Sequence, residues 1–145
     1  MPKVPNQITK QLILCGKPED VWNSAFGSTK ALCSWLPDRI EGEFCENGRL
    51  TLIWGNHRSD AILCEFNPPN SLAFQWHPGD AYTIEQLPES QLTTVRIELN
   101  QHIDDTQITL TETGFENIPE EKRQWAYDQN NSGWDEELEK LKNRN

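Results

Sequence analysis

The hydrophobic and polar positions of this 145-residue chain show two periodicities, the period of two typical of strands and the spacing typical of a helix. Positions 8–15 alternate with a period of two and place Ile8, Leu12 and Leu14 on one side, which predicts a first strand. Gly16 ends it. Two short helices then follow before the long section in which the period returns to two.

The first of these helices is predicted from Lys17 onward. Pro18 suits the first helical position, and the acids at 19 and 20 complement the positive end of the helix dipole. Ser28 is a suitable N-cap for a second short helix that carries Trp35 on its inward side. The opening unit is therefore strand, helix, helix.

From residue 39 to 114 the chain reads as short strands joined by turns. The clearest example is 93–103, where Val95, Ile97 and Leu99 alternate with polar residues. Successive strands with tight turns between them predict an antiparallel meander. The same alternation predicts strands around 50–55, 61–66, 72–77 and 106–113. Residues 79–91 fit neither period, and we expect a loop there with a short strand at 82–85.

The last section, after Gly114-Phe115, has the spacing of one long helix. Asn117 is a candidate N-cap and Pro119 suits the first turn. Gly133 interrupts the pattern at a cost of about 1 kcal/mol relative to alanine. A close approach of the helix backbone to the sheet would explain the glycine. Alternatively, the run 130–133 splits the helix in two.

Composition and charge argue against some classes of binding partner. The chain has 13 Lys and Arg against 23 Asp and Glu, a formal charge of −10, and no basic stripe. Such a field repels phosphate backbones and anionic lipid, so we expect neither nucleic acid nor membrane as a partner. The first residues lack the apolar run of a signal peptide and no segment is long enough to span a bilayer, which predicts a cytoplasmic protein.

The cysteines and histidines do not have the spacing of a metal site. Zinc sites place two ligands two to four residues apart, and neither the four cysteines nor the three histidines do so. We expect no metal and no cofactor. Cys15 and Cys64 fall inside strand patterns, where cysteine serves as a small hydrophobic residue.

Local signatures along the chain resemble one known family. They are Lys17-Pro18-Glu19-Asp20-Val21-Trp22, Trp35, Trp54, Pro69 with Leu72-Ala73-Phe74-Gln75-Trp76, Thr94-Val95, Thr109-Leu110-Thr111, Gly114-Phe115, and Gly133-Trp134 followed by Leu138 and Leu141. In this order they resemble the homologues of the activator of the ninety-kilodalton heat-shock protein ATPase, within the START-like (SRPBCC) superfamily. The resemblance covers residues 7–142.

The resemblance implies an α+β helix-grip fold. A curved antiparallel sheet of six to seven strands would pack around the long C-terminal helix, with two short helices after the first strand. We expect one START-like domain over residues 1–145, with its core at about 7–142. The family's eukaryotic co-chaperones have a further N-terminal chaperone-binding domain without a counterpart here, which argues against co-chaperone activity.

The resemblance also implies a cavity between helix and sheet that holds a hydrophobic molecule. The candidates for the wall of this cavity are residues that face inward on the strands and on the helix, although the same residues could simply fill the core. The candidates are Trp54, Phe74, Trp76, Val95, Ile97, Leu110, Glu112, Trp125 and Trp134.

Glu112 is the candidate with distinctive chemistry. It shares a strand face with Ile108 and Leu110, and a buried carboxylate there could orient a ligand or act as a general base with a raised pKa. Alternatively, it lies beyond the edge of the core, in solvent or beside a lysine. Its position near the strand end favours this second interpretation.

Three functions remain open, in order of preference. The first is binding of a small hydrophobic molecule in the cavity. The second is an enzyme of the cyclase or hydrolase type in the same cavity, which would need at least two convergent polar groups where the sequence nominates only Glu112. The third is a protein-interaction role with a chaperone. No catalytic motif is present, and neither the ligand nor the oligomeric state follows from the sequence.

Overall fold

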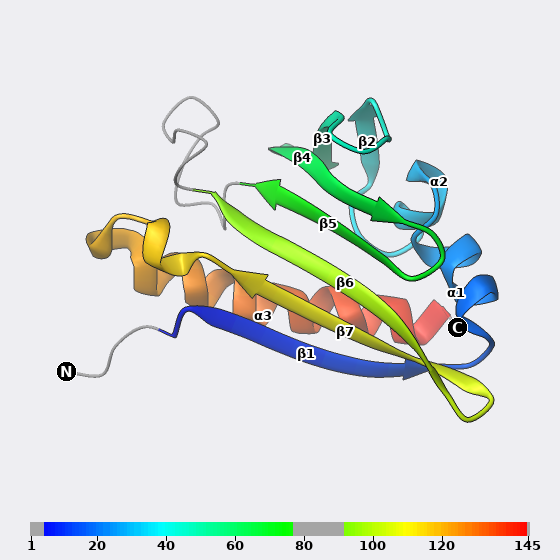
Figure 1. Ribbon diagram of the computed structural model, residues 1–145. Coiled ribbons are helices and arrows are strands. Elements are labelled where there is room, and N and C mark those ends of the chain that lie inside the picture. Colours follow the sequence, from blue (N-terminus) through cyan, green and yellow to red (C-terminus); the bar gives the residue numbers. More distant parts are fainter. Residues whose placement is uncertain (1–4, 77–91, 145) are drawn as a thin grey trace.

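The computed structural model describes residues 5–76 and 92–144, and within them it has the predicted α+β architecture (Figure 1). The elements follow the order expected for a helix-grip fold. They are β1 (Gln7–Leu14), α1 (Pro18–Ala25), α2 (Thr29–Leu32), β2 (Arg39–Gly42), β3 (Arg49–Trp54), β4 (His57–Asn67), β5 (Ser71–Trp76), β6 (Thr93–His102), β7 (Asp105–Thr113), the 3₁₀ turn η3 (Phe115–Asn117) and α3 (Glu120–Arg144). The strand predicted at 82–85 lies outside the described residues.

The strands form one antiparallel sheet in the order β1-β7-β6-β5-β4-β3-β2, with seven strands among the described residues. Each neighbouring pair from β2 to β7 is consecutive in the chain, as the predicted meander requires. β1 joins β7 and places the first strand at one edge. A register shift between Leu63 and Glu65 makes a bulge in β4.

Helix α3 lies along one face of this curved sheet, and α1 and α2 lie near its C-terminal end (Figure 1). Arg144 Nη2 donates a 2.8 Å hydrogen bond to the carbonyl oxygen of Ser24, which fixes the end of α3 against α1. The alternating residues of β6 and β7 that face α3 are buried, as their period predicted. They include Val95 and Ile97 at 0 % exposure and Leu110 at 0 %.

Both short helices begin where the sequence placed them, but α2 ends at Leu32, so the expectation that this helix carries Trp35 is wrong. Pro18 is the first residue of α1. Ser28 is the N-cap of α2, and its Oγ accepts a 3.1 Å hydrogen bond from the backbone N–H of Ala31. Cys15 corrects one expectation, because β1 ends at Leu14 and Cys15 is exposed rather than a buried strand residue.

Helix α3 differs from the prediction at two points. Asn117 is the last residue of η3 and does not cap α3, which begins at Glu120. Gly133 neither splits the helix nor allows a close approach to the sheet, because a Cβ built on it meets nothing within 4 Å. The helix runs through this glycine without a break, so both expectations for Gly133 are wrong.

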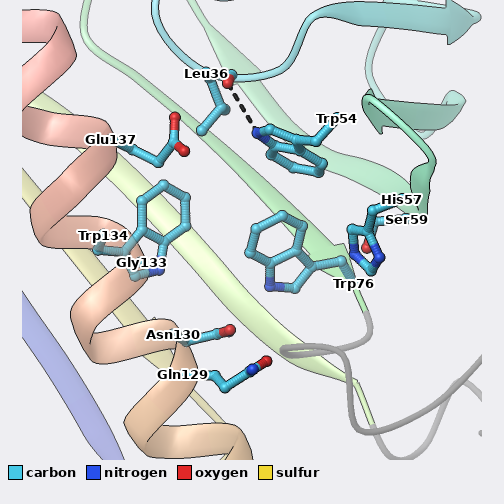
Figure 2. A pocket seen from close by; sticks show the side chains of 10 residues that line it. All are labelled: Leu36, Trp54, His57, Ser59, Trp76, Gln129, Asn130, Gly133, Trp134 and Glu137. Carbon is cyan, nitrogen blue, oxygen red and sulfur yellow. Dashed lines mark hydrogen bonds between the residues drawn. The ribbon is translucent and has the colours of Figure 1, made fainter.

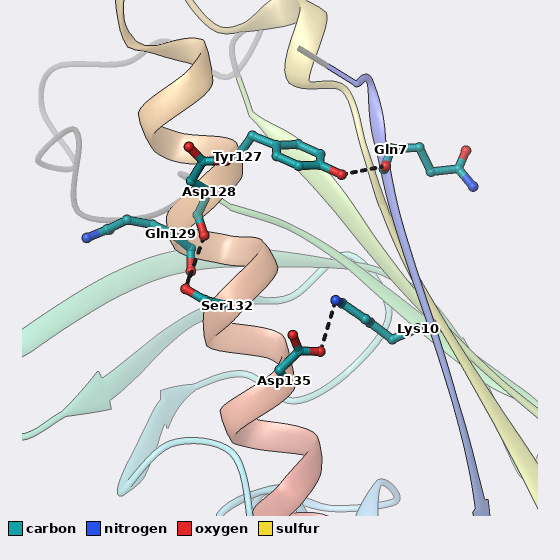
Figure 3. A network of polar contacts seen from close by, with 7 residues as sticks. All are labelled: Gln7, Lys10, Tyr127, Asp128, Gln129, Ser132 and Asp135. Atoms are coloured by element: carbon teal, nitrogen blue, oxygen red, sulfur yellow. Dashed lines mark hydrogen bonds and ion pairs between the residues drawn. The ribbon is translucent and has the colours of Figure 1, made fainter.

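The side of α3 that faces β1 carries polar contacts (Figure 3). Tyr127 Oη donates to the backbone oxygen of Gln7 at 3.4 Å, and Lys10 Nζ lies 2.9 Å from Asp135 Oδ1. Such partly exposed contacts each contribute little energy. No helix within the described part of the chain is long and apolar enough to cross a membrane.

Candidate functional site

A pocket of about 230 Å³ lies between α3 and the strands β3, β4 and β5 (Figure 2). One wall comes from the sheet and from the segment after α2, and the other comes from one face of α3. The helix residues that face it follow the spacing i, i+1, i+4, i+5 and i+8, which places them on one face. The lining residues are Leu36, Trp54, His57, Ser59 and Trp76 on one side, and Gln129, Asn130, Gly133, Trp134 and Glu137 on the other.

Three tryptophan rings dominate the pocket. Trp76 stacks on Trp134 with ring centroids 5.6 Å apart and an interplanar angle of 27°, and Trp54 lies 6.0 Å from Trp76 at 54°. Each indole N–H is already used within the protein. Trp54 Nε1 donates to the backbone oxygen of Leu36 at 2.9 Å, while Trp76 and Trp134 donate to Glu112. The rings therefore offer carbon surface to the pocket.

Glu112 is fully buried, at 0 % exposure, and accepts hydrogen bonds at both oxygens. Oε1 accepts from Trp134 Nε1 at 2.8 Å and from Asn130 Nδ2 at 3.0 Å. Oε2 accepts from Trp76 Nε1 at 3.0 Å, from Thr93 Oγ1 at 2.5 Å and from Asn130 Nδ2 at 2.8 Å. The prediction that it lies beyond the core edge, in solvent or beside a lysine, is wrong.

Sheet register explains how these groups converge. Glu112 on β7 is opposite Val95 on β6, so Thr93 is its diagonal neighbour on the same face. Thr93 in turn is opposite Trp76 on β5. Asn130 and Trp134 are four residues apart on α3 and approach Glu112 from the helix side.

The environment of Glu112 perturbs its titration. Burial raises the pKa of the Glu112 carboxyl above its ordinary value, and the hydrogen bonds from Thr93, Trp76, Trp134 and Asn130 oppose this rise without cancelling it. None of these four groups carries a charge, so the carboxylate has no cationic partner among them. The four donors therefore hold the carboxyl in place and favour its charged form, whereas burial, the larger effect, favours its neutral form.

Glu137 is the second acidic group of the site and lines the pocket itself. Burial raises its pKa; the nearby Lys140 opposes this effect, and the negative charges of Glu136 and Asp38 add to it. Lys140 Nζ lies 2.8 Å from Glu137 Oε2 as an ion pair. Lys140 is therefore the partner of this buried oxygen.

The predicted lining residues separate into three groups. Trp54, Trp76 and Trp134 do line the pocket, and Glu112 lies directly behind two of them. Four residues belong to the hydrophobic core and are not among those that line this pocket: Phe74, Val95, Ile97 and Leu110.

Trp125 is a correction, because the expectation that it faces inward is wrong. Its side chain is 45 % exposed. Trp125 and Trp134 are nine residues apart, which is two and a half helical turns, so the two lie on opposite faces of α3. Ala126, at 0 % exposure, occupies the inward position instead.

The polar lining of the pocket was not predicted from the sequence. Asn130 precedes Trp134 by four residues and Glu137 follows it by three, so a helical projection from Trp134 would have found both. His57 and Ser59 follow Trp54 around the turn into β4 and gave no comparable signal. Within the described part of the chain, no cluster of three or more His, Cys, Asp or Glu side chains could hold a metal ion.

Solved structures share this fold at low sequence identity. Protein MLL2253 from Mesorhizobium loti is 18% identical with a TM-score of 0.74, and the alignment covers 94% of each chain. The Aha1 dimer from Colwellia psychrerythraea is 16% identical with a TM-score of 0.72, covering 94% of this chain and 92% of that one.

A third neighbour is DynU16, from the dynemicin biosynthetic locus. It is 13% identical with a TM-score of 0.74, and the alignment covers 97% of this chain but only 47% of DynU16. A search of curated proteins finds no match. The sequence profile of the activator of Hsp90 ATPase homolog 1-like proteins matches residues 16–144, which is most of the chain. This protein therefore belongs to the activator of Hsp90 ATPase homolog 1-like family, with a START-like fold.

Proposed function

We propose that the protein binds a small, largely apolar molecule in the pocket between α3 and the sheet. The observation that carries this proposal is the arrangement of Trp54, Trp76 and Trp134 around it. Because their indole N–H groups bond to Leu36 and Glu112, the rings present apolar surface and need no polar partner from a ligand.

The volume of the pocket limits the size of the ligand. A cavity of about 150 Å³ accommodates benzene, whereas sites for drug-sized molecules span about 300–1,000 Å³. At about 230 Å³ the pocket suits a molecule with one aromatic ring and a short substituent. A long acyl chain or a polycyclic molecule would require the walls to move.

Glu112 supports the pocket but is poorly placed for proton transfer. Its two oxygens accept five hydrogen bonds from the protein, and it is not among the pocket-lining residues. A general base must reach the proton that it removes. We therefore assign to Glu112 the role of holding the rings of Trp76 and Trp134 in position, and prefer binding to catalysis.

Two measurements test this function. Native mass spectrometry of gently purified protein would reveal a co-purified molecule as a mass increase over the denatured chain. Isothermal titration calorimetry with 2-phenylethanol, a neutral single-ring probe, would measure binding directly. We expect binding by the unmodified protein and a loss of at least about tenfold in affinity for Trp54→Ala, which removes one wall of the pocket.

Trp125→Ala is the matched control, because it removes an exposed tryptophan outside the pocket. Its affinity for 2-phenylethanol should equal that of the unmodified protein. Circular dichroism would establish that both variants are folded. A clean mass together with no measurable binding, or an equal loss in both variants, would contradict the proposed function.

A further inference from the structure

The pocket combines three aromatic faces with an acidic side chain. Figure 2 shows the Glu137 carboxylate reaching from α3 toward the side where Leu36 and Trp54 lie, above the ring of Trp134. Glu137 and all three tryptophans line the same space. Neutral apolar ligands make no use of such a carboxylate.

Aromatic faces attract cations. The face of an indole ring carries the negative part of its quadrupole, and a cation within about 6 Å of the ring centre is attracted to it, most strongly for tryptophan. The positive N–H edges of the three indoles point at protein oxygens. The rings therefore lack N–H donors that would favour an anionic ligand.

Glu137 supplies a charged acceptor at the same place. Its Oε2 is buried and pairs with Lys140 Nζ at 2.8 Å. The Lys140 side chain is 53% exposed and can turn toward water when another cation arrives. A ligand ammonium would then take the place of the Lys140 ammonium beside this oxygen.

The surrounding charges also favour a cation. Asp38 and Glu136 lie close enough to Glu137 to affect its ionisation, and the whole chain carries a formal charge of −10. Of the described residues that line the pocket or pair with its lining, Lys140 and the imidazole of His57 can carry positive charge.

We propose that the ligand of this pocket is a small organic cation, an ammonium group on a short aliphatic chain that can carry an aromatic ring, with Glu137 as its counter-ion. This inference rests on the proposed function and assigns the chemical class of its ligand. The indole faces contact the apolar part of the ligand and attract its ammonium group, and the Glu137 carboxylate orients that ammonium.

The test compares two probes that differ only in their terminal group, phenethylammonium and 2-phenylethanol, by calorimetry at neutral pH. We expect the cation to bind at least about tenfold more tightly. Glu137→Gln should reduce this ratio to about twofold or less, chiefly by weakening the binding of phenethylammonium. Circular dichroism would confirm that the variant is folded.

Glu136→Gln is the matched control. It removes the same charge from the neighbouring position on α3, where the side chain is exposed and outside the pocket. It should retain the preference for the cation, since only the long-range field changes.

Each contrary outcome has its own meaning. Equal binding of the two probes would overturn the cation inference and leave the proposed function intact. A preference that survives in Glu137→Gln, or that disappears equally in Glu136→Gln, would overturn the role of Glu137. Absence of binding by both probes would overturn the cation inference and the proposed function together.

Discussion

Replacing Glu112 with glutamine tests the buried cluster without changing its shape. Glutamine has one oxygen acceptor and one NH₂ group that only donates. In either orientation, the NH₂ group faces an indole N–H: that of Trp134 at the Oε1 position or that of Trp76 at the Oε2 position. One indole N–H therefore loses its acceptor inside the core.

The indole N–H that is left without an acceptor determines the expected loss of unfolding free energy. A buried group left without its partner costs about 1–3 kcal/mol of unfolding free energy. A neutral carboxyl avoids this loss, because its O–H can donate to Thr93 Oγ1, which lies 2.5 Å away. The glutamine variant should thus be less stable than the unmodified protein wherever Glu112 is neutral.

The direction of the pKa shift of Glu112 predicts how the destabilisation by Glu112→Gln changes with pH. Burial raises the pKa of Glu112 in the folded protein above the value of 4.5 that applies when it is exposed. Between these two values the folded state binds more protons than the unfolded state, so this group's contribution to stability falls as pH rises through the window. Each unit of pKa difference corresponds to about 1.36 kcal/mol. Because glutamine does not titrate, the destabilisation by Glu112→Gln should be largest below about pH 4.5 and should decrease as pH rises toward 8.

Urea denaturation of both proteins, followed by far-ultraviolet circular dichroism at several pH values, measures this difference. Taking the difference cancels the titration of other groups. Glu65→Gln is a contrasting control, because the pKa of Glu65 is lowered, chiefly by its hydrogen bond from Ser71. Stability from Glu65 is lost only as pH falls below about 4.5, so the effect of that variant should stay constant between about pH 5 and 8. A Glu112→Gln effect that grows toward pH 8 would refute the reasoning about burial.

Three further substitutions probe other parts of the structure by the same denaturation assay. Gly133→Ala should raise the free energy of unfolding by about 0.5–1 kcal/mol, since alanine favours the helix and the new methyl group meets no atom within 4 Å. The same methyl group should weaken ligand binding because it narrows the pocket. A loss of stability would contradict this prediction. Gly42→Ala should destabilise by more than about 2 kcal/mol, because its φ is +111° and a Cβ would lie 2.2 Å from the oxygen of Arg49; a neutral effect would show that the strand end relaxes freely. Phe115→Ala should cost about 3–5 kcal/mol, because the ring is fully buried against Tyr127, and a cost below about 1 kcal/mol would refute this estimate of packing.

Most of the strands and the starts of both short helices follow from local chemistry, so the sequence alone was sufficient to predict them, whereas strand β2 was not assigned in advance. The alternation of Val95, Ile97 and Leu99 assigns one face of β6 to the core, and a shift of one residue would expose all three. Ser28 caps α2 through an interaction that spans three residues. Such features depend on neighbours in the chain and need no knowledge of the rest of the fold.

The site depends on contacts between distant segments. Glu112 lies near a strand end, where alternation gives its face but not whether another element covers it. The covering elements are α3, through Asn130 and Trp134, and β5, through Trp76, which precedes Glu112 by 36 residues. Only docking of the helix buried this carboxylate and supplied its donors.

The sequence by itself determined the order of elements, the inward faces of the strands and the family resemblance, because hydrophobic periodicity and turn residues act over a few positions. The tertiary structure decided which inward residues fill the core and which line a pocket. It also decided that Trp125 faces solvent while Asn130 and Glu137 face the sheet. The physical reason is that the rotation of α3 about its axis and its distance from the sheet arise from packing against many segments at once, and no local pattern contains them.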